Sequence, residues 1–62
     1  MTPVSSSFIE GLDYDESSGT LTVYFKSGES YDYTVPKDVY TAFLAAPSKG
    51  RYFRTVIKGT YE

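Results

Sequence analysis

The stretch TLTVYFK, residues 20–26, contains the pattern that decides the fold. Leu21, Val23 and Phe25 share one face of an extended chain, whereas the side chains between them share the other face. Strict alternation of this kind is typical of a β-strand with one covered face and one wetter face. We therefore build the expected fold outward from a strand at this position.

Further strands are predicted on both sides of this segment. Residues 8–14 (FIEGLDY) change the parity of their apolar side chains around Gly11, which indicates a β-bulge. The turn at residues 15–19 (DESSG) ends in a glycine suited to a left-handed backbone. After a second turn, residues 30–35 (SYDYTV) form another strand. Its apolar face carries Tyr31, Tyr33 and Val35.

The chain after the third strand is predicted to be helical. Pro36 suits the first position of a helix, and Pro47 ends that helix. Its apolar residues, Val39, Tyr40, Phe43 and Leu44, have an amphipathic spacing.

A second helix is predicted from Ser48, which can cap its first turn, to Gly59, which suits a C-terminal stop. The same spacing recurs in Tyr52, Phe53, Val56 and Ile57. The predicted fold class is α+β: a three-stranded antiparallel meander followed by two helices packed on one sheet face (β-β-β-α-α). We expect residues 1–62 to form a single domain.

The composition favours a binding module over an enzyme. The 62 residues include seven tyrosines but no histidine, cysteine or tryptophan. Most side chains that perform chemistry near neutral pH are therefore missing, and we expect no catalytic residue, cofactor or metal ion. No signal peptide is visible, and no stretch approaches the roughly 20 apolar residues of a membrane span. We expect a cytoplasmic protein that does not contact membranes.

The charges are unevenly distributed along the chain. The net charge is −2, but residues 1–36 hold six acids and one base, whereas residues 37–62 hold two acids and five bases. A chain that is acidic overall can still hold an anion at a basic segment. Four of the bases lie on the predicted second helix: Lys49, Arg51, Arg54 and Lys58.

These cations suggest a polyanion site. At about 100° per residue, Arg51, Arg54 and Lys58 fall together opposite the apolar arc, and Lys49 lies in the first turn. Gly50 would let a ligand approach that turn closely. The four cations are candidates for binding phosphates of RNA or another anionic ligand. The alternative is a solvated outer face, which every surface helix needs.

The tyrosines are open to two interpretations. Tyr31 and Tyr33 are a stacking platform for unpaired bases if their face is exposed, and core residues if it faces the helices. Tyr24 has the opposite parity and is a candidate for an exposed ring. A tyrosine-rich surface suits a protein partner or a self-dimer equally well, so a protein–protein interaction module is the alternative function.

The order of these features resembles the KTSC domain, a short family of unknown function. The similarity starts at Val4 and spans nearly the whole chain. The central Y-x-Y motif appears as Tyr31-Asp32-Tyr33, and the closing S-x-G-x-Y-F segment appears at residues 48–53. No single piece is specific, but the ordered set is.

The resemblance carries expectations about function. KTSC domains occur as free-standing proteins in bacteria and phages and at the C-terminus of some lysyl-tRNA synthetases, which implies RNA binding. This chain departs from the family pattern in two places. The stretch from Tyr33 to Val35 is one residue shorter, and Arg54 stands where an asparagine often follows Y-F. If that asparagine contacts a ligand in the family, Arg54 either argues against the same ligand here or biases it towards anions.

Overall fold

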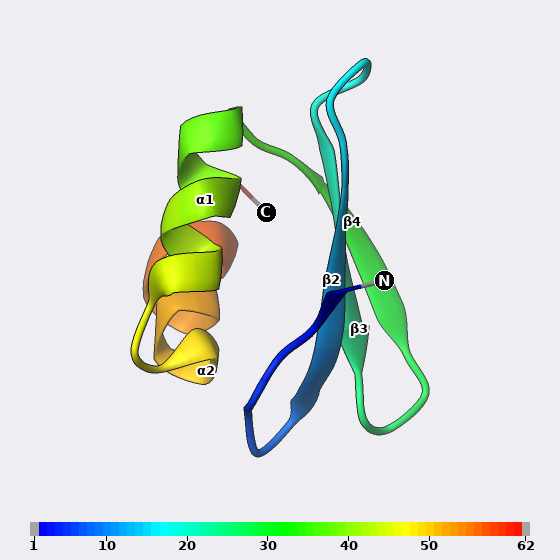
Figure 1. The fold of residues 1–62 in the computed structure, drawn as a ribbon, viewed down its shortest axis with the longest axis vertical. Coiled ribbons are helices and arrows are strands. Elements are labelled where there is room, and N and C mark those ends of the chain that lie inside the picture. Colours follow the sequence, from blue (N-terminus) through cyan, green and yellow to red (C-terminus); the bar gives the residue numbers. More distant parts are fainter. Residues whose placement is uncertain (1, 62) are drawn as a thin grey trace.

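The chain folds into an antiparallel sheet with helices on one face (Figure 1). The structure is a computed structural model that describes residues 2–61. Its strands are β1 (Thr2–Pro3), β2 (Ile9–Asp15), β3 (Thr20–Phe25) and β4 (Ser30–Thr34). Its helical elements are α1 (Lys37–Ala45), α2 (Lys49–Tyr52), the π-helix η1 (Phe53–Ile57) and α3 (Lys58–Thr60). The α+β class and the central meander of β2, β3 and β4 are confirmed.

The prediction of three strands is wrong, because a fourth strand precedes the meander. In the described chain the strand order is β1-β2-β3-β4, and Thr2 and Pro3 of β1 pair with Leu12 and Gly11 of β2. A strand of two residues shows no alternation from which it could be predicted. Pro3 is tolerated there because β1 lies at the edge of the sheet.

The turns and the bulge match the sequence-based expectations. The β2–β3 register shifts between Ile9 and Gly11, which confirms the bulge. Gly19 has φ 69°, the left-handed backbone expected at the end of the β2–β3 turn. The Tyr14 hydroxyl donates a hydrogen bond of 2.8 Å to the Val35 carbonyl. This bond ties β2 to the segment that leaves the sheet for α1.

The helical half differs from the prediction in detail. Pro36 is the residue before α1 rather than its first helical residue. Ser48 caps α2 as expected, since its side chain accepts a hydrogen bond from the Arg51 amide. Gly59 does not stop the helix, because α3 includes it and Gly59 does not have a positive φ. The π-helix was not predicted. It is defined by i→i+5 bonds such as that from the Lys58 amide to the Phe53 carbonyl.

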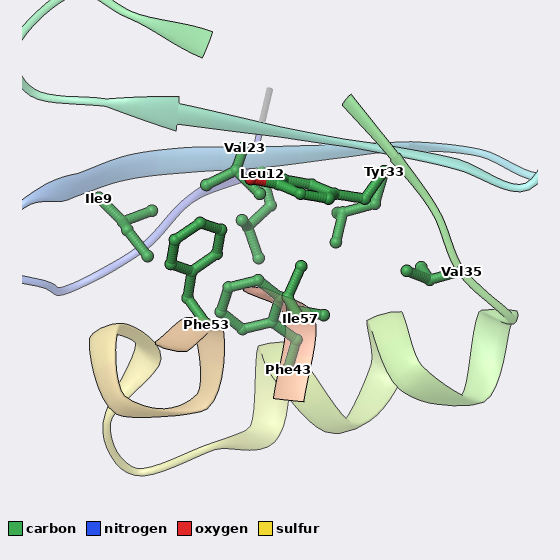
Figure 2. Packing of buried hydrophobic residues seen from close by; sticks show 9 residues of the cluster. Ile9, Leu12, Val23, Tyr33, Val35, Phe43, Phe53 and Ile57 are labelled. Atoms are coloured by element: carbon green, nitrogen blue, oxygen red, sulfur yellow. The ribbon is translucent and has the colours of Figure 1, made fainter. Parts of the chain in front are cut away.

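The core lies between the sheet and the helices (Figure 2). Phe53 and Ile57 of η1 and Phe43 of α1 point toward the sheet. The sheet and the segment after β4 contribute the rest of this cluster: Ile9, Leu12, Leu21, Val23, Tyr33 and Val35. The inward arc of the second helix is thus confirmed, and its cations are left outside or at the margin.

Candidate functional site

A polar cleft lies between the segment before β2 and the start of the second helix. It has a volume of about 390 Å³. Its walls are residues 5–8 on one side and residues 47–51 with Arg54 on the other. Figure 1 shows both segments at the same end of the molecule. We call this hollow the cationic cleft, because Lys49, Arg51 and Arg54 line it and no acidic side chain of residues 2–61 does.

The two arginines are free to meet a ligand. Arg51 and Arg54 are exposed. Among residues 2–61, the single ion pair joins Lys37 to Glu16, so no described carboxylate neutralises either guanidinium. That pair lies at the start of α1 and in the β2–β3 turn, which Figure 1 shows at the other end of the molecule from α2.

Lys49 differs from the arginines because its ammonium group is already engaged. Its Nζ donates a hydrogen bond of 2.6 Å to the Ala46 carbonyl, and the side chain is half-buried. The charge still contributes to the potential in the cleft. Direct contact with a ligand would use the two donors that remain on the ammonium group.

Serine hydroxyls shape both walls of the cleft. The Ser6 hydroxyl accepts hydrogen bonds from the amides of Phe8 (3.4 Å) and Ile9 (3.3 Å), which fixes the approach to β2. The Ser48 hydroxyl accepts one from the Arg51 amide at 3.3 Å, which fixes the first turn of α2. Ser5 and Ser7 are exposed on the cleft wall. A hydroxyl can donate to an anionic oxygen, so these side chains suit the same ligand as the arginines.

The Phe8 ring occupies the space into which a side chain at position 50 would project. Gly50 is buried, and a Cβ built on it would clash with Cε1 of Phe8. The glycine thus admits the Phe8 ring, which docks the segment before β2 against the second helix. Gly50 also lines the cationic cleft, so the expectation that it lets a ligand approach the first turn stays a prediction.

An aromatic groove adjoins the cationic cleft. It has a volume of about 520 Å³. Ser7 and Phe8 line both hollows, so the two share a wall. The other residues that line the aromatic groove are Phe25, Lys26, Ser27, Glu29, Tyr31, Tyr33, Phe53 and Lys58.

The rings of this groove pack on one another. Phe25 stands at the centre, with ring centroids 6.1 Å from Phe8, 5.7 Å from Tyr31 and 5.4 Å from Phe53. The Tyr31 ring is 50% exposed, and its hydroxyl donates a hydrogen bond of 3.2 Å to Glu29. The negative charge of Glu29, together with that hydrogen bond, raises the pKa of Tyr31.

The structure separates the three tyrosines that the sequence suggested as stacking or interface residues. Tyr33 is only 8% exposed and belongs to the core. Tyr31 has the same parity but lies nearer the β3–β4 turn, opposite Val23, and is 50% exposed. Tyr24 alternates with Val23 and Phe25 and lies on the opposite sheet face, half-buried. No single surface contains all three rings.

Lys58 is separated from the other cations of the second helix. It lines the aromatic groove, whereas Lys49, Arg51 and Arg54 line the cationic cleft. A helical wheel of constant 100° steps places Lys58 beside Arg54. The π-helix breaks that regularity, because each residue within it turns through a smaller angle.

Several groove residues were missed by reasoning from the sequence. They come from three places in the chain: Phe8 lies just before β2, Phe25 ends β3, and Glu29 lies in the β3–β4 turn. One feature of the sequence could have indicated Phe8. Its parity differs from that of Ile9, which is buried, so the Phe8 ring lies outside the core and is exposed. Within residues 2–61, no group of three or more acidic side chains could hold a metal ion, and no helix is long and apolar enough to cross a membrane.

Comparisons with known proteins identify relatives of this chain. The KTSC domain family matches residues 5–61. The crystal structure of a KTSC domain protein from Yersinia pestis superposes with a TM-score of 0.92 at 40% identity, covering 98% of this chain and 87% of that one.

Two curated relatives differ greatly in length. A lysine–tRNA ligase of Nostoc sp. is 44% identical over 57 residues, which are 90% of this chain and 10% of the ligase. A protein of Tsukamurella paurometabola is 41% identical over 59 residues, which are 94% of this chain and 88% of that protein. The chain therefore spans about a tenth of the length of the ligase that it matches.

Proposed function

This chain belongs to the KTSC domain family, and a segment of a lysine–tRNA ligase is similar to it. We propose that the chain is a small non-catalytic module that binds RNA. The cationic cleft holds the phosphate backbone. The observation that carries this proposal is the lining of that cleft: two exposed arginines and a lysine, with no acidic side chain from the described part of the chain.

The chemistry of the cleft suits a phosphodiester. Each guanidinium presents a planar fork of donors that matches two phosphate oxygens, and the exposed hydroxyls of Ser5 and Ser7 add further donors. Contacts of this kind fix a strand in place without reading its sequence. The module is therefore expected to bind RNA with little sequence preference.

The overall charge of −2 does not oppose this role. Screening limits the reach of exposed charges to about 8 Å at physiological ionic strength. The charged residues that line the cleft are Lys49, Arg51 and Arg54, so the charges nearest to a ligand there are positive.

A binding titration at two salt concentrations tests this proposal. The probes are tRNA and a single-stranded RNA, and the variants are Arg51→Ala and Arg54→Ala. Each variant should weaken binding to both probes and reduce the slope of log K against log salt by about 0.7 for a single strand. Lys37→Ala removes one cation from the distant ion pair and is the matched control, which should leave the slope unchanged. Absence of binding at low salt, or equal binding by the arginine variants, would reject the proposal.

A second candidate function is self-association or protein binding, and the free edge of β4 favours it. The Phe25 amide donates a hydrogen bond to the Glu29 carbonyl, and the Val35 amide donates one to the Gly19 carbonyl. In an antiparallel pair, residues whose amides point towards the partner strand alternate with residues whose amides point away from it. The amides of Ser30, Asp32 and Thr34 consequently point away from β3. An unpaired edge can accept a strand from another chain.

Sedimentation at increasing protein concentration distinguishes this candidate. A dimer formed through β4 should be lost in Asp32→Pro, which removes one outward amide while leaving the ladder to β3 intact. A chain that stays monomeric at every concentration, and that captures no protein partner through this edge, would count against the candidate.

A further inference from the structure

The aromatic groove is the second concave surface of the molecule and is chemically unlike the cationic cleft. Five aromatic residues line it, and Tyr31 is the most exposed of them. Single-strand binding proteins typically present such rings, because every base can stack on an aromatic face whatever its identity. A duplex hides these base faces, so a ring can reach them only in an unpaired strand.

The two hollows are joined in a way that fits one nucleotide chain. Ser7 and Phe8 line both hollows, so the cleft and the groove adjoin, and a strand that passes over these two residues can contact both. Lys26 and Lys58 line the groove and outnumber its single acid, Glu29. This charge balance favours an occupant that carries negative charge over a neutral apolar one.

We propose that the aromatic groove receives an unpaired base that stacks on Tyr31, so that the module selects single-stranded over double-stranded RNA. This proposal rests on the function proposed above, because the cationic cleft supplies the contacts to the backbone. It adds the substrate class and a positioning role for one ring.

Phe8 links the two parts of this site. Its ring packs beside Gly50 in the second helix and stacks 6.1 Å from Phe25 in the groove. A movement of the segment before β2 would therefore change both hollows together. Tyr31 is the better residue to test, because it is exposed and its removal leaves the Phe8–Gly50 contact intact.

The test compares two probes of equal charge: a single-stranded RNA of about eight nucleotides, within the usual range of small single-strand binders, and an abasic phosphodiester of the same length. The wild-type protein should bind the RNA about 5- to 150-fold more tightly, which is the usual effect of stacking one base. Tyr31→Ala should lose this preference while binding the abasic probe as before. Tyr31→Phe should keep it, and Tyr24→Ala, on the other sheet face, is the matched control.

The outcomes separate this proposal from the one on which it rests. If Tyr31→Ala changes both probes equally or neither, while Arg51→Ala weakens both, the base groove is overturned and the RNA-binding proposal stands. If neither probe binds at low salt, both fall. If the groove instead mediates a dimer that Tyr31→Ala abolishes, a second copy is its occupant and the base proposal is overturned.

A measurement on the wild-type chain guards against a folding defect in the variant. A strand that contains 2-aminopurine should lose fluorescence on binding, because stacking on a ring quenches this base. Unchanged fluorescence at saturation would overturn the proposal.

Discussion

Gly50 accommodates the Phe8 ring at the point where the segment before β2 meets the second helix. We expect Gly50→Ala to destabilise the fold by about 1–3 kcal/mol, because the new methyl group would displace that ring. Gly59 is the matched control. It lies in the same helical run, and a Cβ there would approach no atom closer than 3.8 Å, so Gly59→Ala should be neutral or slightly stabilising.

Thermal or urea unfolding of both variants measures this difference. In a Phe8→Ala background the cost of Gly50→Ala should shrink, because the two residues share one contact. Equal costs for the two glycine variants would mean that Phe8 does not occupy this space.

Tyr31 and Glu29 make a second prediction at the level of single residues. The Glu29 carboxylate raises the pKa of Tyr31, because it disfavours the phenolate and accepts a hydrogen bond from the phenol. Glu29→Gln removes the charge, so the pKa of Tyr31 should fall towards its ordinary value. An NMR titration of the Tyr31 ring measures this, with Asp32→Asn as the control at a neighbouring acid. An unchanged pKa in Glu29→Gln would place the carboxylate away from the phenol.

At the level of elements, the start of the second helix combines a structural role with the proposed binding role. The Ser48 side chain satisfies the Arg51 amide and thereby fixes the turn that presents Arg51 to the cleft. We expect Ser48→Ala to cost about 1 kcal/mol of stability, the usual effect of losing a cap, and to weaken RNA binding. Ser48→Asn keeps an acceptor and should restore both. A stable Ser48→Ala variant in a urea titration would show that the cap is dispensable.

The elements also show what the sequence could predict. Alternation in residues 20–26 and the amphipathic spacing of Val39, Tyr40, Phe43 and Leu44 are local patterns, and the meander and α1 follow from them. β1 could not be predicted, because two residues carry no periodicity. The π-helix could not be predicted from the sequence either. The spacing of its apolar residues is compatible with an α-helix, and only the hydrogen bonds distinguish the two.

The candidate site was predictable to a smaller extent. The sequence places Lys49, Arg51 and Arg54 at one helix start, and the structure brings them to one cleft. The aromatic groove depends on contacts between residues far apart in the chain, such as Phe8 with Phe25 and Phe25 with Phe53. Tyr31 and Tyr33 share a parity, so alternation alone could not predict that Tyr33 is buried and Tyr31 is half exposed.

At the level of the whole molecule, the Lys37–Glu16 ion pair and the candidate site lie at different ends of the fold. The Lys37–Glu16 pair closes one end, where the β2–β3 turn meets the start of α1 (Figure 1). The cationic cleft and the aromatic groove, which share the wall formed by Ser7 and Phe8, are built around the start of the second helix and the residues next to it. A small domain can hold an anionic strand in this way while its net charge stays at −2.

The central claim is that the cleft beside Arg51 and Arg54 receives the phosphates of an RNA strand. Amide chemical-shift mapping by NMR, with a short single-stranded RNA added at low salt, tests it most directly. We predict that the shifts concentrate in residues 5–8 and 48–54 and weaken as salt is added. Shifts confined to the β4 edge or to the outer sheet face around Tyr24, or no shifts at all, would contradict the account.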